Sequence, residues 1–570
     1  MEKYGTPAEL LIGSFKNKKF VRRICLEDAA LTGTKLTYAN MDYETGMAAA
    51  LFKSFYINPG DTVSLLLEDG IHFFMPWLGA MRIGAMAHPI NYLYAAEQVL
   101  YALELCETKL LVIQERYAWD DFKNRPSEYM LRIREKFPDL KIVVMHDPAK
   151  FGAEIKEKEN GAGYLGTFSW KTLMQFMHSY DHVAHRYLED SFQLICTSGT
   201  TGRPKAVVQH CGMLEPNVRD LIEVYKLTEH DRTLLINRLF HVNAQVTNFF
   251  PMVLLGGRTV LGAKDPKKFF ETARKHKITY SSVIPPTLKY LDWRALKRNP
   301  LKRLRFLIVG ADILQKDLHR EFMETTGIYV RPGWGMTETL CWGSATPVCE
   351  PIIYGSIGYA LPHTKMKIVD PEKNWEEVRD GELGRLIVSG ENVFNEYFKN
   401  PEATEKAFAP SEKHGEGWFD TGDTCYKAKP HYPEQNTPFH FVGRASADSW
   451  KVRGEFVLGT EIDDFIRKNP GLEDAMAVPI AIGGETETAV CVVLKPDNIE
   501  PDAELPGSIA EFAIMQYCEK GRQEGRIGKH IKIKEIIFVP KIELGDTGKK
   551  SRKKMAEVAQ KYIDARLTEV

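Results

Sequence analysis

Short apolar runs alternate with helix-patterned segments along this chain until about residue 380. Residues 61–67 (DTVSLLL), 109–113 (KLLVI), 141–145 (KIVVM) and 305–312 (RFLIVGAD) are typical of buried strands. After the last of them, a helical pattern covers 316–327 and ends at Gly327. Such alternation predicts an α/β fold of mostly parallel sheets covered by helices, with ligand sites at the carboxyl ends of the strands.

Beyond about residue 380 the pattern changes to alternating strands and tight turns. The segments 381–390, 415–423 and 438–444 are typical of hairpins and predict a small β subdomain. A compact α+β pattern then comprises a hairpin at 475–496, a helix at 508–522, a strand at 534–540 and a terminal helix at 551–567. We therefore predict a large N-terminal domain over residues 1–444 and a smaller C-terminal domain over residues 445–570.

Composition excludes several classes of protein. The chain has 570 residues, 44% apolar and 26% charged, which excludes collagen-like, mucin-like and disordered chains. Its formal net charge of -1 argues against a strongly basic nucleic-acid binder. The most apolar stretch, 72–90, is broken by Pro76 and Arg82, so it predicts a buried helix running into a strand and no membrane span.

The pattern of cysteines and the N-terminal residues indicate the cellular compartment. The 9 cysteines are scattered and form no C-x-x-C pair, which predicts neither a disulfide framework nor a zinc site. The first residues show no basic segment followed by a long apolar run, so we expect no secretory signal. Both observations favour a cytoplasmic protein.

Residues 192–210 (FQLICTSGTTGRPKAVVQH) carry the clearest chemical signal. A buried strand runs into a turn of glycines and hydroxyl residues, and a lysine follows. Backbone N–H groups, hydroxyls and one lysine charge together make a cradle for polyphosphate, although an exposed Ser/Thr/Gly turn is the alternative for such a segment taken alone. Pro204 before the lysine distinguishes the segment from the Walker pattern. The cradle residues are Thr197, Ser198, Gly199, Thr200, Thr201, Gly202 and Lys205.

With this loop, the chain resembles the adenylate-forming superfamily of acyl-CoA synthetases, carrier-protein adenylation domains and luciferases. It is most similar to the AMP-forming acyl-CoA synthetases. The resemblance covers nearly the whole length, and its motifs follow in the family's order. It implies that the loop at 197–205 holds the β- and γ-phosphates of ATP.

Two further motifs are expected at the nucleotide by resemblance. Gly310, Ala311 and Asp312 correspond to the adenine-facing turn, where Asp312 can also cap the following helix. The second motif comprises Gly333, Trp334, Gly335, Met336, Thr337 and Glu338. The resemblance implies that Thr337 contacts the α-phosphate and that Glu338 orients Mg²⁺, which prefers such hard oxygen ligands.

Residues of the second motif and of the segment 241–243 concern the binding of adenine and of the acid substrate. Trp334 replaces the usual tyrosine and can stack on adenine. Gly335 is expected to leave open space beside it, which favours an acyl group larger than acetyl. By resemblance, His241, Val242 and Asn243 line the acyl pocket, whereas a histidine among apolar neighbours is otherwise a core residue.

Motifs of the C-terminal part concern the ribose, the hinge and the thiol. The resemblance places Asp423 and Arg444 at the ribose, although an aspartate after Thr-Gly is also a common turn residue. It implies a hinge near 444–449 at Asp448, but three residues instead of two separate Arg444 from Asp448. CoA is expected to bind near Lys451, Gly454 and Glu455.

The segment Thr547-Gly548-Lys549-Lys550 resembles the element that carries the family's catalytic lysine. Its position after Thr-Gly favours Lys549, with Lys550 as the alternative. A solvated basic face is the other interpretation, because residues 520–570 hold fourteen basic and seven acidic residues.

These motifs together predict an ATP-dependent acid–CoA ligase with a mobile C-terminal domain. It would use ATP, Mg²⁺ and coenzyme A, form acyl-AMP and then acyl-CoA, and act on a medium-chain or carnitine/crotonobetaine-like acid. The alternatives are an enzyme that loads a carrier protein and an inactive nucleotide- or acyl-binding relative. We expect small-molecule partners and no nucleic acid, and the sequence leaves room for a homo-oligomer.

Overall fold

The computed structural model divides into two compact units. It describes residues 5–120, 125–145, 167–175, 177–184, 186–197, 204–262, 265–294, 296, 301–430, 436–444, 449–452, 455–482, 485–495, 509–523, 527, 531–544 and 550–568. The first unit comprises Met1–Met366 and Val388–Phe419, and the second comprises Lys367–Ile387 and Asp420–Val570. The expected domain boundary after residue 444 falls inside the second unit, at the end of a strand, and stays a prediction.

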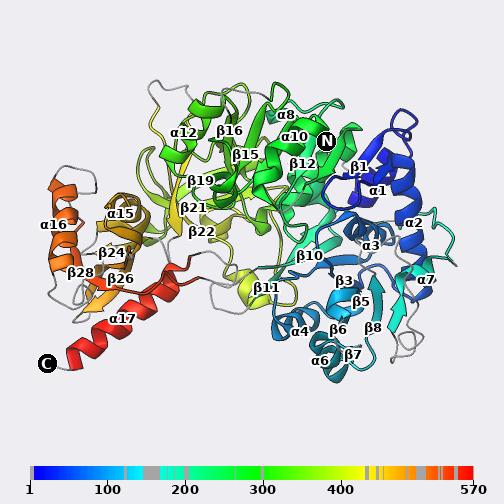
Figure 1. Ribbon diagram of the computed structural model, residues 1–570, viewed down its shortest axis with the longest axis horizontal. Helices are drawn as coiled ribbons and strands as arrows, with labels where there is room; N and C mark the ends of the chain where they lie inside the picture. The colour runs from blue at the N-terminus through cyan, green and yellow to red at the C-terminus, as the bar shows by residue number, and fades with distance from the viewer. Residues whose placement is uncertain are drawn as a thin grey trace. The chain divides into compact units, whose positions relative to one another are not determined.

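A seven-stranded sheet forms one half of the first unit (Figure 1). Its order is β11 (Lys205–His210), β10 (Ser191–Thr197), β4 (Met86–Pro89), β3 (Thr62–Leu66), β5 (Thr108–Gln114), β8 (Lys141–Met145) and β9 (Thr167–Ser169). All neighbours are parallel except β10 and β11. The predicted strands at 61–67, 109–113 and 141–145 are confirmed as β3, β5 and β8.

A nine-stranded sheet forms the other half of this unit. Its order is β18 (Tyr359–Ala360), β17 (Ser344–Ala345), β16 (Tyr329–Trp334), β15 (Phe306–Val309), β14 (Tyr280–Val283), β12 (Arg232–Leu235), β13 (Arg258–Leu261), β1 (Ile24–Asp28) and β2 (Lys35–Thr37). The six strands from β16 to β1 run parallel. A separate pair joins β6 (Trp119–Asp120) and β7 (Arg125–Pro126).

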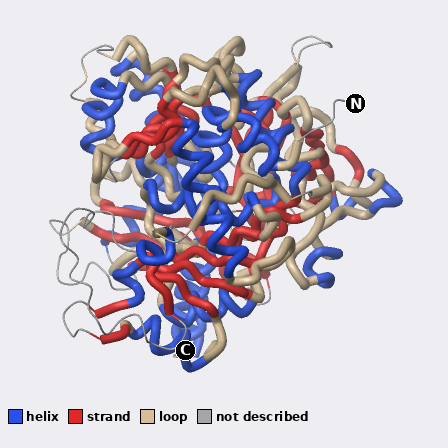
Figure 2. Tube along the Cα trace, turned by 90° about the vertical axis from the view of Figure 1, so that its right-hand side faces the viewer, coloured by secondary structure: helices blue, strands red, loops and turns tan. Residues whose placement is uncertain are grey.

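Helices lie beside the strands throughout the structure (Figure 2), and those of the first unit have the following bounds. They are α1 (Pro7–Phe15), α2 (Tyr38–Ser54), α3 (Ile71–Arg82), α4 (Ala96–Leu105), α5 (Glu115–Ala118), α6 (Glu128–Lys136), α7 (Trp170–Met174), α8 (Leu214–Val224), α9 (Phe250–Leu255), α10 (Phe269–His276), α11 (Pro285–Tyr290), α12 (Lys316–Thr326), α13 (Pro401–Glu405) and α14 (Ser411–His414). Short turns are η2 (Cys211–Met213), η4 (Pro266–Lys268) and η5 (Thr337–Thr339), and η3 (Ala244–Phe249) is a π-helix.

Local signals explain several of these elements. The apolar stretch 72–90 forms α3 and β4, as predicted. Helix α12 ends at Gly327, whose φ of 69° is a left-handed conformation that glycine adopts without strain. Helices α4 and α6 pack on β3, β5 and β8 through a buried cluster that includes Leu100, Leu111 and Met130. These mostly parallel, helix-covered sheets confirm the predicted α/β fold.

The second unit holds most of the predicted β subdomain and the whole α+β segment. One sheet has the order β20 (Glu376–Glu377), β19 (Thr364–Asp370), β21 (Gly384–Gly390), β22 (Phe419–Lys427) and β23 (Phe439–Arg444). The short helix η6 (Pro371–Lys373) lies between β19 and β20 in the sequence. A hairpin pairs β24 (Ser449–Val452) with β25 (Glu455–Leu458). The last sheet orders β26 (Leu472–Ile482), β27 (Glu485–Leu494) and β28 (Ile533–Phe538). Its helices are α15 (Gly459–Ile466), α16 (Ile509–Gln523) and α17 (Arg552–Thr568).

Both faces of this last sheet are buried. Ala475 and Ala477 belong to the cluster that includes α15 and α16, whereas Met476 and Val478 belong to the cluster that includes α17. The alternation follows the two-residue period of a strand. The predicted hairpin, helices and strand beyond residue 470 are thus confirmed within one or two residues of their bounds, except that the hairpin already begins at Leu472.

In the described part of the chain, no helix combines the length and the apolar character that a membrane crossing needs.

Candidate active site

The strand that leads into the predicted phosphate loop and the strand that leaves it are paired. Thr197 ends β10 and Lys205 begins β11, and the two residues stand opposite each other in the antiparallel register. The Thr197 hydroxyl donates to the Lys205 carbonyl at 3.5 Å. Ser198, Gly199, Thr200, Thr201 and Gly202 lie outside the described residues. The sequence did not reveal β11 as a strand, although AVVQH has the β-branched residues of one.

The two motifs predicted to contact the nucleotide lie at the carboxyl ends of adjacent parallel strands. Gly310 follows β15 and Gly333 lies near the end of β16, next to the register pair Val309 and Pro332. A Cβ on Gly310 would lie 2.6 Å from the Trp342 ring, and a Cβ on Gly333 would lie 2.7 Å from the same ring. Both glycines therefore make room for Trp342, a residue that sequence reasoning missed.

Trp342 is itself fixed by the π-helix η3. Its Nε1 donates to the Thr247 hydroxyl at 2.7 Å, and it is 1% exposed. Cys341 Sγ lies 3.7 Å from the same hydroxyl. Burial raises the pKa of the Cys341 thiol, so it stays neutral beside the nucleotide motif.

Asp312 does not cap the helix that follows it. Its Oδ1 accepts only a local bond from Ile313 N–H at 2.8 Å among the bonds described, and the residue is exposed. The N-cap of α12 is Gln315, which makes no side-chain cap bond. Ala311 adopts a φ of 70°, a left-handed backbone conformation that costs conformational energy in a residue other than glycine. Asp312 is thus presented at an exposed turn after β15.

The space beside Gly335 is not open, contrary to our expectation. A Cβ there would lie 1.7 Å from the Cys341 carbonyl oxygen and 2.7 Å from Trp342 Cα. Because both neighbours are backbone, the glycine is required by a close approach of two chain segments. Trp334 is 6% exposed and packs at Gly343, where a Cβ would lie 2.6 Å from its ring. The glycine at position 335 is therefore explained by backbone packing and does not indicate the size of the acyl group.

Glu338 lies in a polar cluster with Tyr397 and Lys205. The Tyr397 hydroxyl donates to Glu338 Oε1 at 2.9 Å, and the carboxylate residue is 6% exposed. Lys205 Nζ lies 4.6 Å from the centre of the Tyr397 ring, a distance at which a cation is attracted to the ring face. One tyrosine thus links the lysine of the phosphate loop to the predicted magnesium carboxylate. No motif identified Tyr397 in the sequence.

A network of buried side-chain hydrogen bonds supports the backbone of Thr337. Trp77 Nε1 donates to Gln193 Oε1 at 2.6 Å, and Gln193 Nε2 donates at 2.8 Å to both Gln209 and Gln245. Gln209 Nε2 then donates to the Thr337 carbonyl at 3.3 Å. Since a buried amide without partners is costly, these side chains have defined orientations. The network joins β10, β11 and η3 to the turn that carries Thr337.

The predicted acyl segment follows β12 and precedes η3. Asn243 Oδ1 accepts from Asn237 Nδ2 at 2.6 Å and from the Ser282 hydroxyl at 2.9 Å. His241 is exposed and lies against Phe240, with ring centroids 4.5 Å apart, whereas Val242 is buried. His241 is therefore not a core residue.

In the second unit, the two predicted ribose residues face each other. Asp423 on β22 and Arg444 on β23 are register partners in the antiparallel pair. Asp423 is 2% exposed, and its N–H donates to the Thr421 hydroxyl at 3.0 Å. The Arg444 side chain is not among the described ones. The strand pairing places these two positions next to each other, and their contact with the ribose stays a prediction.

Most of the predicted hinge, thiol and lysine residues lie outside the described part. Asp448, Gly454 and Lys549 are not described, and only the strand positions of Lys451 on β24 and Glu455 on β25 are. Lys550 is described, and its Nζ lies 2.5 Å from Asp474 Oδ2. Lys550 is thus already engaged in an ion pair within its own unit.

Several known proteins are similar to this chain in sequence. The model of a family described as AMP-binding enzyme matches residues 16–398. Sulfoacetate–CoA ligase of Cupriavidus necator is 25% identical over 527 residues, 92% of this chain and 92% of that protein. Crotonobetaine/carnitine–CoA ligase of Proteus mirabilis is 26% identical over 516 residues, 88% of this chain and 90% of that protein.

Solved structures share the fold. The crystal structure of ATP-bound MatB from Rhodopseudomonas palustris has a TM-score of 0.79 and 22% identity to this chain, and covers 97% of this chain and 98% of its own. At this identity, the similarity shows the architecture alone.

Proposed function

Because this chain belongs to the AMP-binding enzyme family, we propose that it is an AMP-forming acid–CoA ligase. In the first half-reaction the carboxylate oxygen of the acid attacks the α-phosphorus of ATP, and the bond to pyrophosphate breaks. In the second, the CoA thiol gives up its proton to solvent and its sulfur attacks the carbonyl carbon of acyl-AMP; the C–S bond forms, and AMP leaves with the electron pair of the broken C–O bond. The products are acyl-CoA, AMP and pyrophosphate.

The cluster of Lys205, Tyr397 and Glu338 carries this proposal. A carboxylate and a triphosphate repel each other, and two like charges about 4 Å apart cost about 4 kcal/mol at an effective dielectric constant of 20. Lys205 supplies a positive charge at the end of the phosphate loop, and its side chain is oriented by the Tyr397 ring. Preorganised charges of this kind stabilise a displacement at phosphorus without a protein nucleophile.

The residues present fit a magnesium ion. Glu338 offers a nearly buried carboxylate beside the turn of Thr337, which is the hard oxygen donor that Mg²⁺ takes together with phosphate oxygens. When bound, the ion would neutralise phosphate charge. The hydrogen bond from the Tyr397 hydroxyl to Oε1 orients the Glu338 carboxylate.

The other nucleotide contacts follow the same proposal. Thr337 contacts the α-phosphate, and the loop Thr197–Lys205 holds the departing pyrophosphate. Adenine lies at the turn Gly310–Asp312 and at Trp334, in the segment Gly333–Met336. Asp423 and Arg444 bind the ribose, which their opposed strand positions support.

Lys549 is proposed as the cation that stabilises the first transition state. The ion pair of Lys550 with Asp474 supports this choice between the two neighbouring lysines, because it engages Lys550 elsewhere. In the second half-reaction, a rotation of the C-terminal domain (residues 445–570) about Asp448 would bring Lys451, Gly454 and Glu455 to the CoA thiol. A rigid-body motion of this kind needs few residues to change their backbone angles.

For the acid, we propose a small carboxylate with a second charged or polar group. The relatives that the chain matches are named for sulfoacetate and for crotonobetaine and carnitine, which fit this description. His241, which is exposed, and Asn243, whose amide is hydrogen-bonded, are polar residues of the segment expected to line the acyl pocket. Medium-chain fatty acids are the second class to test, since pocket contacts differ by only about 1–3 kcal/mol per methylene.

Acid-dependent release of pyrophosphate, with and without CoA, tests the proposal. Carnitine, crotonobetaine, sulfoacetate and straight-chain acids are offered in parallel, and AMP and acyl-CoA are quantified. A ligase releases pyrophosphate with its acid and forms AMP and acyl-CoA once CoA is added. An enzyme that loads a carrier protein forms acyl-AMP but no acyl-CoA, and an inactive relative forms neither.

A further inference from the structure

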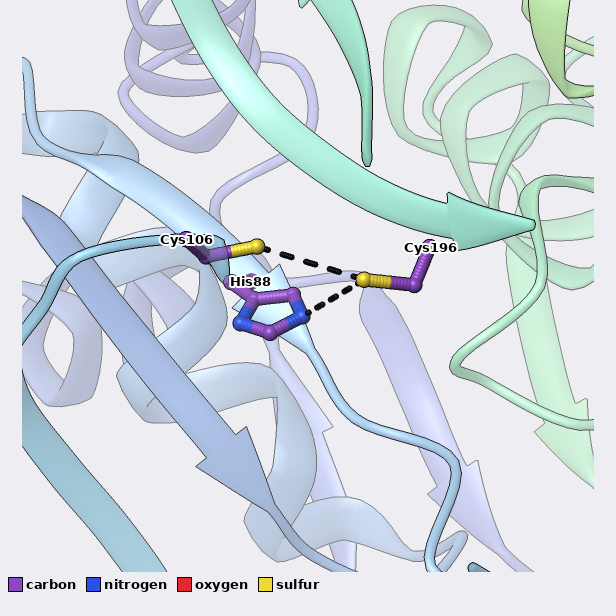
Figure 3. Close-up of side chains that lie close together, drawn as sticks. All are labelled: His88, Cys106 and Cys196. Atoms are coloured by element: carbon purple, nitrogen blue, oxygen red, sulfur yellow. Dashed lines mark hydrogen bonds between the residues drawn. The ribbon is translucent and has the colours of Figure 1, made fainter. Parts of the chain in front are cut away.

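Three side chains without a role in the proposed reaction converge next to the strand that enters the phosphate loop (Figure 3). They are His88 on β4, Cys106 directly after α4, and Cys196 on β10, one residue before Thr197. Cys196 Sγ lies 3.9 Å from Cys106 Sγ and 3.5 Å from His88 Nε2. The ligand atoms of all three lie within 4.8 Å of one another. Among the described residues, no other group of three histidine, cysteine or acidic side chains meets this condition.

A chain of hydroxyls behind His88 determines its tautomer. The Thr108 hydroxyl donates to the Leu103 carbonyl at 3.1 Å, and a carbonyl can only accept. Thr108 Oγ1 therefore accepts from the Ser64 hydroxyl, 2.7 Å away. Ser64 Oγ in turn accepts from His88 Nδ1–H at 2.8 Å. The proton of a neutral His88 is thus held on Nδ1, and the lone pair of Nε2 points to Cys196.

This arrangement matches what a zinc-binding histidine requires. A histidine that binds zinc through one ring nitrogen almost always donates its other N–H to a fixed acceptor, which orients the ring. Here Ser64 on β3 is the register partner of His88 on β4, so the acceptor belongs to the sheet itself. His88, Ser64 and Cys106 are fully buried, whereas Cys196 is partly exposed.

The spacing of the ligand atoms also suits a tetrahedral ion. Zinc bonds of about 2.3 Å to sulfur and about 2.0–2.1 Å to nitrogen give tetrahedral edges of roughly 3.8 Å between sulfurs and roughly 3.5 Å between sulfur and nitrogen. The two measured separations, 3.9 Å and 3.5 Å, lie close to these edges. The third separation, between Cys106 Sγ and the His88 ring nitrogen, is within 4.8 Å, so binding would need at most about 1.3 Å of closure along that edge.

We propose that His88, Cys106 and Cys196 form a zinc site, with a water or another small ligand as the fourth donor. Binding replaces the two thiol protons, which pass to solvent, by two Zn–S bonds and one Zn–N bond. Two thiolates and one Zn²⁺ sum to zero charge, which suits a buried location. The C-x-x-C spacing sought in the sequence is not needed, because the three ligands come from three separate elements.

A disulfide between Cys106 and Cys196 is the competing use of the same thiols. It requires the sulfurs to close from 3.9 Å to about 2.05 Å. It would also leave the oriented lone pair of His88 Nε2 without the thiol that it faces now. The tautomer and the spacing both favour a metal ion.

Metal titration of the reduced full-length protein tests the site. Co²⁺, which binds zinc sites and absorbs visible and near-ultraviolet light, is added first, and Zn²⁺ is then added to displace it. We expect one equivalent of Co²⁺ with thiolate-to-metal charge-transfer absorption and tetrahedral d–d bands, and complete displacement by one equivalent of Zn²⁺. The assay does not involve ATP or acid, so its outcome is independent of the proposed ligase function.

Variants locate the ion. Cys106→Ser and Cys106→Ala remove a ligand and should each weaken Zn²⁺ binding by more than the factor of about 10–100 that loss of an outer hydrogen-bond partner costs. Ser64→Ala removes that outer partner and should weaken binding by about 10–100-fold. Cys349→Ser changes an exposed cysteine and should leave binding unchanged. Thermal unfolding identifies any variant that is not folded.

Several results would overturn the site. Absence of charge-transfer absorption in the folded, reduced protein is one. Binding by both Cys106 variants as tight as that of the unaltered protein is another. A third is a Cys106–Cys196 disulfide that persists under reducing conditions in which the other thiols are free.

Discussion

The hydroxyl of Tyr397 donates a hydrogen bond to Glu338 Oε1 at 2.9 Å across 59 residues of sequence. The same ring faces Lys205 Nζ. Tyr397→Phe removes the hydroxyl and keeps the ring, so it isolates the bond to the carboxylate. We expect the Mg²⁺ concentration for half-maximal adenylation to rise by about 10–100-fold, as for loss of a hydrogen-bond partner behind a metal ligand. Rates of pyrophosphate release across a Mg²⁺ series measure this.

Tyr290→Phe is the control for that variant, because Tyr290 is 66% exposed. It should leave the Mg²⁺ dependence unchanged. If Tyr397→Phe lowers the rate equally at all Mg²⁺ concentrations, the hydroxyl acts on folding or on Lys205 and does not position Glu338.

Lys549 and Lys550 offer a matched pair of substitutions. Lys549→Ala should lower acyl-AMP formation by about 10²–10³-fold, the scale for loss of one preorganised charge. Formation of acyl-CoA from supplied acyl-AMP should fall much less. Lys550→Ala removes the same charge and breaks the ion pair with Asp474, which is worth about 0–1 kcal/mol at a partly exposed site. A larger loss for Lys550→Ala, or equal losses of Lys549→Ala in both half-reactions, would refute the assignment.

A buried ion pair anchors the helix that follows these lysines. Arg552 Nη2 lies 2.7 Å from Asp463 Oδ2, and the two residues are 5% and 3% exposed. Asp463 also accepts from the Ala477 N–H at 2.6 Å. Asp463→Asn leaves the guanidinium buried without its counter-ion, and we expect unfolding to become easier by about 3–5 kcal/mol. Urea unfolding measures this, with Asp474→Asn at the less buried Lys550 pair as the control. A loss for Asp463→Asn no greater than for the control would contradict it.

The Gly335→Ala variant tests the close backbone contact at Gly335, where we had expected open space. Gly335→Ala places a Cβ 1.7 Å from the Cys341 carbonyl oxygen, and no side-chain rotation relieves a clash with backbone. We expect a loss of stability of about 3 kcal/mol or more. Gly13→Ala is the matched control, since nothing lies within 4 Å of its Cβ position in α1 and alanine favours helix by about 1 kcal/mol. Equal melting temperatures of the two variants would show that the 335–341 turn rearranges freely.

Periodicity and local turn chemistry predicted the framework. Apolar runs identified β3, β5, β8 and β15 because buried parallel strands are apolar on both faces. Gly327 identified the end of α12 because only a left-handed residue closes the helix there. Features of this kind depend on neighbours in the sequence, so a single sequence carries them.

The supports of the site could not be predicted in the same way. Tyr397 reaches Glu338, and Trp342 fills the space of Gly310 and Gly333, only after distant segments have folded together. The three ligands of the proposed zinc site are likewise 18 or more residues apart and share no spacing pattern. Such partners follow from sheet register and packing, which a list of motifs does not contain.

Acid should destabilise the first unit through His319, which is fully buried on α12. Its Nε2–H donates to the Val330 carbonyl at 3.0 Å, and Nδ1 has no hydrogen-bond partner among the described residues. Burial lowers the pKa of His319 from 6.5 to about 4. Between these two values the unfolded chain binds the proton and the folded chain does not, so stability is complete above about pH 6.5 and is lost as the pH falls toward 4. At 1.36 kcal/mol per pKa unit, the loss approaches about 3 kcal/mol near pH 4.

His319→Gln separates this contribution from the carboxyl groups that titrate in the same range. Glutamine can still donate to the Val330 carbonyl, but it has no proton to gain. Urea unfolding of both proteins between pH 7 and pH 4 gives the difference in their free energies of unfolding. Because only the unaltered protein carries the His319 penalty, the difference should shift in favour of the variant by about 3 kcal/mol as the pH falls. A difference that stays constant over this range would mean that the His319 side chain is protonated or solvated in the folded state, and that its burial between α12 and β16 does not exclude the charge.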